Sequence, residues 1–182
     1  MTEGHTHDPA CALAHGDAPA PGRDGWTLVA VYASPMASFL LHWGRELGFR
    51  TVLVEPDPDR VTDALSGSAD AVVRDPSEAG VTGDADVVVT DHDRGDLGPV
   101  MSPLVRARPR WVGIMGSRRH DPPHVPALRA EGVDEDLIAL VQRPIGLDIG
   151  SKTPAEIALA TLAGLVADRN GKPGGFPAPV AA

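Results

Sequence analysis

Short apolar runs alternate with helix-like segments through the middle of this chain, and that alternation restricts the fold more than any other feature. The runs cover residues 27–32, 51–55, 71–73, 87–90 and 111–115. Their apolar residues do not alternate with polar ones, as is typical of strands that are covered on both faces. We therefore predict an α/β fold of Rossmann-like type, a doubly wound and mostly parallel sheet with helices on both faces.

The segments between the runs carry helical signals. In the first of them Met36, Leu40, Trp43 and Leu47 recur at three- and four-residue steps, and Gly48 follows as a stop signal. We predict helices over residues 35–47, 59–65, 97–106, 117–130, 135–141 and 154–169.

The two ends of the chain lack this periodicity. Residues 1–25 are predicted to form a disordered leader, residues 26–172 one domain, and residues 173–182 a flexible tail. The leader holds His5, His7, Cys11 and His15, but their spacing matches no structural zinc pattern. We interpret it as a solvated tail, with a metal site as the alternative, and we assign no metal ligand.

The charge of the chain limits its partners. The formal net charge is −9 over 182 residues, which opposes general binding to nucleic acid or to anionic membranes. Any anion site must therefore be local. No apolar run approaches the roughly 20 residues of a membrane span, and the N-terminus has no signal-peptide pattern, so we expect a cytoplasmic protein.

The first chemical motif is Gly116-Ser117-Arg118-Arg119-His120, directly after the apolar run 111–115. We expect Gly116 to turn the backbone and Ser117 to cap the next helix, with both arginines beside that helix start. Helix N–H groups and two guanidinium groups favour a phosphate or carboxylate. The alternative is a solvated basic surface paired with acidic residues. His120 and His124, separated by two prolines, are weak evidence for a metal site.

The second motif begins at Arg143 and supplies Gly146 and Gly150, which permit tight turns, on either side of Asp148. Thr153-Pro154-Ala155-Glu156 then has the pattern of a capping box with proline at the first helical position. Aliphatic side chains and a carboxylate between flexible positions suit the binding of a ligand ring or a partner. A purely structural loop needs the same glycines and cap, and both interpretations remain open.

Together these motifs resemble the C-terminal Rossmann domain of the XdhC/CoxI family, accessory proteins of xanthine dehydrogenases and related molybdenum hydroxylases. The resemblance runs from about Trp26 to Lys172. It implies a chaperone that binds molybdenum cofactor (molybdopterin or its nucleotide form), assists its sulfuration and inserts it into a target enzyme. It does not imply that this chain turns over a substrate. The implied partners are a molybdenum hydroxylase subunit and a sulfurtransferase.

The resemblance also implies roles for residues of both motifs. Arg118 and Arg119 would hold the phosphate of the cofactor, and Gly116 and Ser117 would supply the turn and a donor. Asp148 and Glu156 would orient the polar edges of the pterin or brace the loop. Full-length members of the family carry a further N-terminal domain where this sequence has the short leader. We therefore expect cofactor handling to need a separate partner chain or a homodimer.

The first strand-to-helix turn departs from the family pattern. The glycine-rich motif G-x-G-x-x-G of dinucleotide sites falls on residues 32–37, and all three glycines are absent. Tyr32 and Ser34 add bulk there, and Pro35 removes an N–H donor. Ser34 remains a good N-cap whose hydroxyl can meet a smaller anion. Glu55, 21 positions later, matches the acid that holds a ribose in Rossmann sites.

Polar residues follow the fourth predicted strand, where ligands of open parallel sheets bind. Thr90 and Asp96 are candidate ligands, although the aspartates of this loop are equally suited to capping the helix at Leu97. His92 between Asp91 and Asp93 is either a proton relay or metal ligand or part of a polar loop.

Two alternatives to the accessory function remain. One is a NAD(P)- or nucleotide-binding oxidoreductase, which Glu55 favours and Tyr32, Ser34 and Pro35 oppose. The other is a ligand-free scaffold that docks on a hydroxylase. No nucleophile motif points to catalysis, so we assign no catalytic residue. The candidate cofactor-binding residues are Ser34, Glu55, Thr90, Asp96, Gly116, Ser117, Arg118, Arg119, Gly146, Asp148, Gly150, Thr153 and Glu156.

Overall fold

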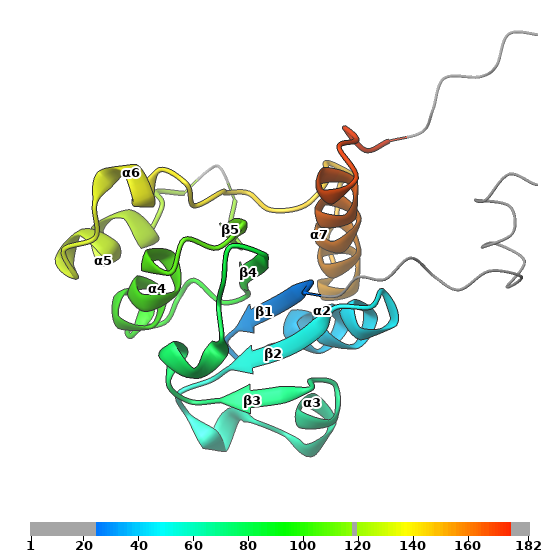
Figure 1. The fold of residues 1–182 in the computed structure, drawn as a ribbon, viewed down its shortest axis with the longest axis horizontal. Helices are drawn as coiled ribbons and strands as arrows, with labels where there is room; N and C mark the ends of the chain where they lie inside the picture. Colours follow the sequence, from blue (N-terminus) through cyan, green and yellow to red (C-terminus); the bar gives the residue numbers. More distant parts are fainter. Residues whose placement is uncertain (1–24, 118–119, 176–182) are drawn as a thin grey trace, which may run out of the picture.

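A five-stranded parallel sheet lies at the centre of the computed structural model, which describes residues 25–117 and 120–175 (Figure 1). The spatial order is β3-β2-β1-β4-β5. Every neighbouring pair of strands is parallel, which confirms the predicted Rossmann-like sheet. The strands are β1 (Thr27–Val31), β2 (Arg50–Val54), β3 (Ala71–Val73), β4 (Ala85–Val89) and β5 (Trp111–Ile114).

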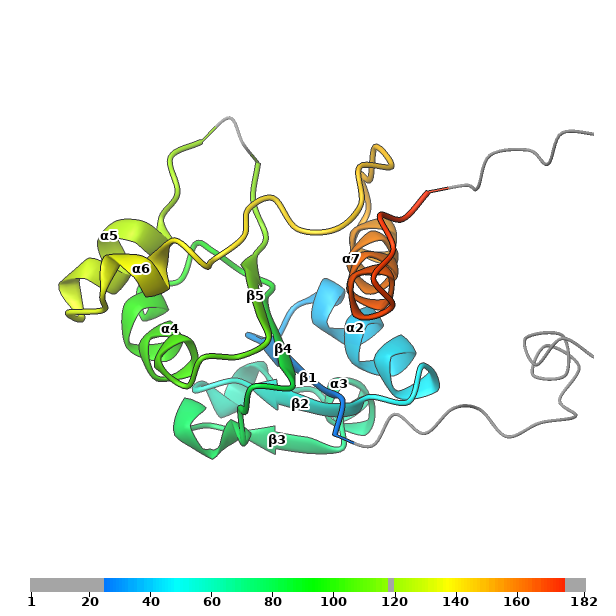
Figure 2. The same ribbon diagram turned by 45° about the horizontal axis from the view of Figure 1, so that its top comes forward.

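Helices cover both faces of this sheet. Helices α2 (Pro35–Glu46) and α7 (Pro154–Arg169) lie side by side on one face, and α4 (Leu97–Arg106) covers the other (Figures 1 and 2). Two short helices, α5 (His124–Ala130) and α6 (Glu135–Ile138), lie on the same side as α4. No helix of the described residues is long and apolar enough to cross a membrane.

The buried strands explain the apolar runs. Successive side chains of a strand point to opposite faces, so each central strand serves two cores. Val29 and Val87 pack in the core on the α4 face. Leu28 and Val88 pack in the core formed with α2 and α7. Because both faces are covered, every residue of β1 and β4 is buried.

Local capping fixes where α2 begins. The Ser34 hydroxyl accepts a hydrogen bond from the Ala37 N–H at 3.0 Å, and Pro35 stands at the first helical position. The prediction of an N-cap at Ser34 is therefore confirmed. Gly48 follows the helix with φ of +83°, as expected for a residue that stops a helix.

Three of the predicted helices differ from the structure by more than one residue in their bounds. The helix predicted over residues 59–65 is a 3₁₀ turn, η1 (Pro58–Arg60), followed by α3 (Asp63–Gly67). The interruption arises because Thr62 starts a new helix by accepting a hydrogen bond from the Leu65 N–H at 3.2 Å. The helix predicted over residues 135–141 ends at Ile138 as α6. A second 3₁₀ turn, η2 (Pro76–Ala79), precedes β4.

The helix predicted to begin at Ser117 begins instead at His124. Pro122 and Pro123 explain the difference, because proline lacks an N–H and disfavours helical geometry in the residue before it. Ser117 is therefore not a helix cap, and the prediction that the basic motif lies at a helix start is wrong.

A buried carboxylate lies near the start of β4, at the end of the sheet where the parallel strands begin. Asp86, on β4, is fully buried and accepts hydrogen bonds from Arg110 Nε and Arg169 Nε, each at 2.7 Å. Burial raises the pKa of Asp86, and the two arginines oppose that shift. The Arg169 guanidinium also lies 4.5 Å from the centroid of the Trp26 ring. This cluster ties the end of α7 to the sheet.

Candidate functional site

The turn after β1 keeps the backbone shape of a glycine turn without the glycine. Tyr32 has φ of +74°, a region that residues other than glycine rarely adopt. Its ring is fully buried, and the Arg94 guanidinium lies 4.4 Å from the ring centroid. Burial raises the pKa of the Tyr32 hydroxyl, and Asp96 adds to that shift. The side chain therefore fills space that a glycine would leave open to a phosphate.

The Glu55 carboxylate accepts four hydrogen bonds from other groups of the protein. Its carboxylate accepts hydrogen bonds from the N–H groups of Ala33 at 2.8 Å and Asp57 at 3.0 Å. Arg94 donates two more, from Nη1 at 3.3 Å and from Nη2 at 3.1 Å. A carboxylate has about four acceptor positions, so none is left for a ribose hydroxyl. In this conformation Glu55 holds the turn together.

Ser34 and Thr90 bind each other rather than facing an open site. The Ser34 hydroxyl donates to Thr90 Oγ1 at 2.8 Å while it caps α2. The Thr90 hydroxyl in turn lies 2.9 Å from the Tyr32 carbonyl and 3.0 Å from the Val31 carbonyl. These contacts join the turn after β1 to the end of β4.

Asp96 stands at the N-cap position of α4 but makes no side-chain capping hydrogen bond. Its Oδ1 lies 3.5 Å from Arg94 Nε instead. His92, in the same loop, lies with Nε2 3.6 Å from Asp93 Oδ1. Sequence reasoning missed Arg94, which links Glu55, Tyr32 and Asp96 at the point where the strand order reverses.

A cavity of about 600 Å³ lies beyond the end of β5, and it unites the two predicted motifs. Five candidate residues line it: Gly116, Ser117, Gly146, Asp148 and Gly150. The rest of its wall comes from Met115, Pro144, Ile145, Leu147, Ile149, Ser151, Ile157 and Ala160. The walls combine aliphatic side chains with polar groups, and Asp148 supplies a carboxylate. We call this the β5 cavity.

Gly146 allows the loop of the β5 cavity to lie directly on α7. Its φ is +82°, and a Cβ placed there would stand 2.9 Å from the Thr161 backbone nitrogen. The neighbouring Leu147 N–H donates to the Ala160 carbonyl at 3.1 Å. Glycine is therefore needed for the close approach.

Thr153 and Glu156 brace the end of this loop instead of lining the cavity. Glu156 accepts hydrogen bonds from the Lys152 N–H at 2.7 Å and the Thr153 N–H at 2.9 Å, and its own N–H donates to Thr153 Oγ1 at 3.2 Å. The bond from Lys152, followed by that from Thr153, lowers the pKa of Glu156. The predicted capping box is confirmed.

Arg143 connects the two motifs, and sequence reasoning did not select it. Its Nη1 donates to the His120 carbonyl at 2.9 Å. A Cβ on Gly116 would lie 2.5 Å from Arg143 Nε and 2.9 Å from Nη2, so the guanidinium would have to shift. The φ of Gly116 is +153°, which adds backbone strain to any substitution. The remaining residues of the basic motif, Arg118 and Arg119, lie outside the described residues.

The candidate residues thus fall into two places. Ser34, Glu55, Thr90 and Asp96 gather where the strand order reverses, and the cavity-lining residues gather beyond β5. Within the ranges 25–117 and 120–175, no group of three or more His, Cys, Asp or Glu side chains is arranged to hold a metal ion. The histidines and Cys11 of the leader lie outside these ranges.

Comparisons with known proteins agree with this architecture. A solved structure described as a xanthine dehydrogenase (BH1974) from Bacillus halodurans is similar in fold, with a TM-score of 0.65, 22% identity, and coverage of 80% of this chain and 45% of that one. The uncharacterized protein YqeB of Escherichia coli (strain K12) is 41% identical over 66 residues, which are 36% of this chain and 12% of YqeB. The chain thus spans less than half the length of either protein. The model of the XdhC Rossmann domain matches residues 28–165, and the chain belongs to this family.

Proposed function

We propose that this protein is an accessory factor of a xanthine dehydrogenase-type molybdenum hydroxylase and that it holds molybdenum cofactor in the β5 cavity. Membership in the XdhC family supports the accessory role. One structural observation carries the cofactor proposal: residues from the Gly116 motif and from the Gly146 motif converge on one cavity of about 600 Å³. That volume lies within the range of small-molecule sites.

The residues of the β5 cavity fit a pterin. Aliphatic side chains such as Ile145 and Leu147 suit the flat faces of a ring, and Asp148 is an exposed carboxylate able to accept its N–H donors. Gly146 and Gly150, both with positive φ, keep the surrounding backbone free of side chains. The cofactor, when bound, would supply the molybdenum chemistry of the target enzyme. This chain would bind, orient and release it.

Delivery requires a surface that a partner can reach. Ile149 lines the cavity and is 54% exposed. An exposed aliphatic side chain at the edge of a ligand site suits transient docking. We propose that a hydroxylase subunit, and a sulfurtransferase acting before it, approach the protein here.

The test is the cofactor content of protein purified from a host that makes molybdopterin. The wild type should carry bound phosphate and pterin absorbance that are absent after expression in a host unable to make the cofactor. Asp148→Ala should lose most of this content, whereas Asp136→Ala, an exposed acid on α6 outside the cavity, should retain it. Equal cofactor content in the two variants would show that Asp148 does not bind the cofactor. A wild type without pterin would refute the cofactor proposal.

The dinucleotide alternative has a separate test. Because the Glu55 carboxylate is saturated by Ala33, Asp57 and Arg94, calorimetric titration with NAD, NADP and FAD should give no binding. The scaffold alternative is tested by recovering the protein with the hydroxylase subunit from cells that lack the cofactor. A complex that survives there would favour docking without carriage.

A further inference from the structure

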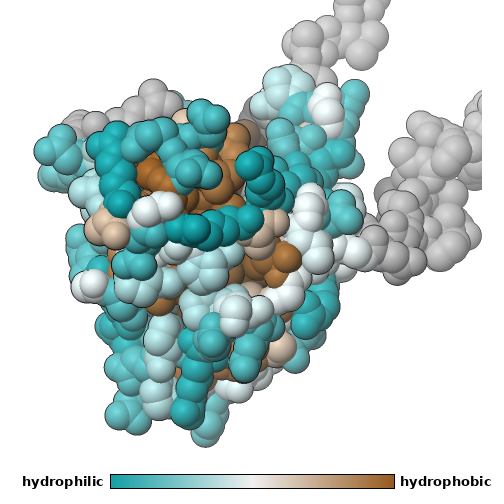
Figure 3. Space-filling model, turned by 60° about the vertical axis from the view of Figure 1, so that its left-hand side comes forward, coloured by the Kyte–Doolittle hydropathy of each residue, from teal (hydrophilic) through white to brown (hydrophobic). Residues whose placement is uncertain are grey.

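A second cavity, of about 490 Å³, lies between α5, α6 and the segment that follows α6. Figure 3 shows an apolar hollow with a hydrophilic rim on the side of the molecule that carries α5 and α6. Its apolar lining includes Val125, Ile138 and Val141, and the charged residues at its edge are Arg129, Glu135 and Arg143. We call it the α5 cavity. It shares no lining residue with the β5 cavity.

The positive charge of Arg143 is not balanced within the described part of the chain. Its single hydrogen bond there runs from Nη1 to the His120 carbonyl, and no carboxylate of the described residues lies within ion-pair distance. Nε and Nη2 are shielded from water without an acceptor. Arg143 as a whole is half-buried. A guanidinium group that is partly shielded from water and has no counter-ion favours an anion nearby.

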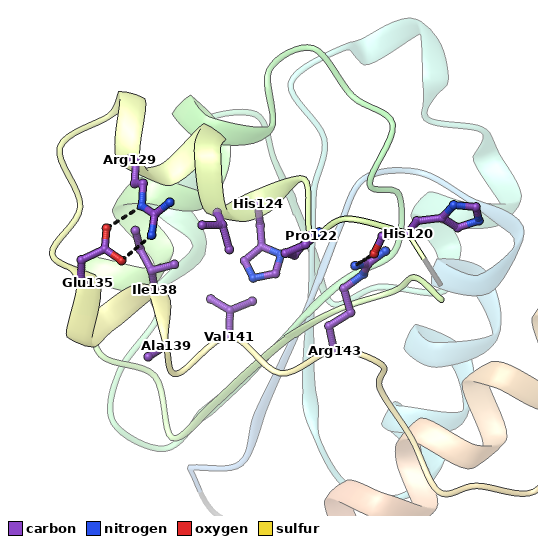
Figure 4. Close-up of a pocket in the computed structure, with 10 residues that line it drawn as sticks. His120, Pro122, His124, Arg129, Glu135, Ile138, Ala139, Val141 and Arg143 are labelled. Carbon is purple, nitrogen blue, oxygen red and sulfur yellow. Dashed lines mark hydrogen bonds and ion pairs between the residues drawn. The ribbon is translucent and has the colours of Figure 1, made fainter. Parts of the chain in front are cut away.

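The other two charged residues of the α5 cavity form an ion pair that is neutral overall. Arg129 donates from Nε to Glu135 Oε1 at 2.6 Å and from Nη2 to Oε2 at 2.9 Å. Figure 4 shows this pair at one end of the cavity and Arg143 at the other, with His124 between them. Among the arginine and glutamate side chains that line it, Arg143 alone is unpaired. A local positive charge thus stands on a chain whose net charge is −9.

His124 adds an uncharged polar group to the α5 cavity. It is the first residue of α5, is 4% exposed, and its Nδ1 has no hydrogen-bond partner. Burial, followed by the charge of Arg143, lowers the pKa of His124 to about 4. The imidazole is therefore neutral at physiological pH and offers hydrogen bonding without a second charge.

We propose that the α5 cavity is a second ligand site, which binds a small organic anion, a carboxylate or a phosphate ester with an apolar body. The apolar body would lie on Val125, Ile138 and Val141, and the anionic group at the Arg143 end. Gly116 covers the edge of the guanidinium formed by Nε and Nη2, so the anion would interact with Arg143 mainly through its charge. This site goes beyond the proposed cofactor function.

The test uses three probes of similar size: benzoate, phenyl phosphate and the uncharged benzamide, each titrated into the full chain by NMR. Benzoate or phenyl phosphate should bind at least about tenfold more tightly than benzamide, and the tighter of the two identifies the anionic group. Equal affinity for benzamide and both anions, or no binding of any probe, would overturn the proposal.

A matched pair of variants tests the location. Ala139 lines the α5 cavity and is exposed, so Ala139→Trp obstructs the cavity without disturbing the core. It should weaken anion binding by at least about tenfold, whereas Leu140→Trp, at the neighbouring exposed position outside the cavity, should not. Unchanged binding by Ala139→Trp would refute the site. Cofactor content should be unaffected in both variants, and Asp148→Ala should still bind the anion, so the two proposals fail independently.

Discussion

His124 should make the protein less stable as the pH falls. Its pKa is lowered from 6.5 to about 4 by burial and by Arg143. Between these two values the unfolded chain binds a proton that the folded protein does not, so folding becomes less favourable as the pH falls through this window. The shift corresponds to about 3 kcal/mol in full, at about 1.4 kcal/mol per pKa unit. About 2 kcal/mol of this is already lost at pH 5.

Urea unfolding at pH 7.5 and pH 5 measures this effect, in buffers free of carboxylates and phosphates because these are the proposed ligands of the α5 cavity. His124→Gln removes the ionisable group, so between the two pH values the wild type should lose about 2 kcal/mol more unfolding free energy than the variant. His42→Gln, at an exposed position on α2, should follow the wild type. If the wild type and His124→Gln lose stability in parallel, His124 is not held neutral by burial.

Three further substitutions test local parts of the structure. Gly116→Ala should destabilise the protein by about 1–3 kcal/mol and lower its Tm, because φ is +153° there and the Cβ would displace the Arg143 guanidinium, while Gly83→Ala, which has open space around it, should not; equal Tm values would contradict both the backbone strain and the contact. Asp86→Asn should cost about 3–5 kcal/mol in urea unfolding because it removes a buried charge from between two arginines, and a loss below 1 kcal/mol would refute the anchoring role. Ser34→Ala should cost about 1–2 kcal/mol, and an unchanged urea midpoint would show that the α2 cap contributes nothing.

The sheet and the main helices could be predicted because their signals are local. Strands buried on both faces require continuous apolar runs, and β1 and β4 carry them. The starts of α2 and α7 depend on side chains within three residues of the cap, Ser34 and Thr153. The start of α5 was also encoded locally, since Pro122 and Pro123 stand directly before it. The prediction of a start at Ser117 rested on the turn at Gly116 and the capping ability of Ser117, and it did not allow for these prolines.

The candidate site could be predicted only in part, because its decisive contacts join distant parts of the chain. The separation of 21 residues from Ser34 identified Glu55 as the acid that follows the second strand of a Rossmann site. This separation did not indicate that Arg94, 39 residues further along the chain, would donate hydrogen bonds to the Glu55 carboxylate. In the same way, the motif around Gly116 was visible, but its dependence on Arg143 appears only once the two loops are folded against each other.

These long-range contacts also explain how this Rossmann sheet can lack an open site at the turn after β1 and still have a cavity beyond β5. Tyr32 retains the left-handed turn of the glycine motif, so the chain path from β1 into α2 is preserved. Arg94 contacts Tyr32 and engages the carboxylate of Glu55, the group that would hold the ribose in a dinucleotide site. The glycines that allow close backbone approach are found instead beyond β5, at Gly116 and Gly146. Because these glycines let a ligand approach the backbone beyond β5, we expect cofactor binding to depend on the β5 cavity and not on the point where the strand order reverses.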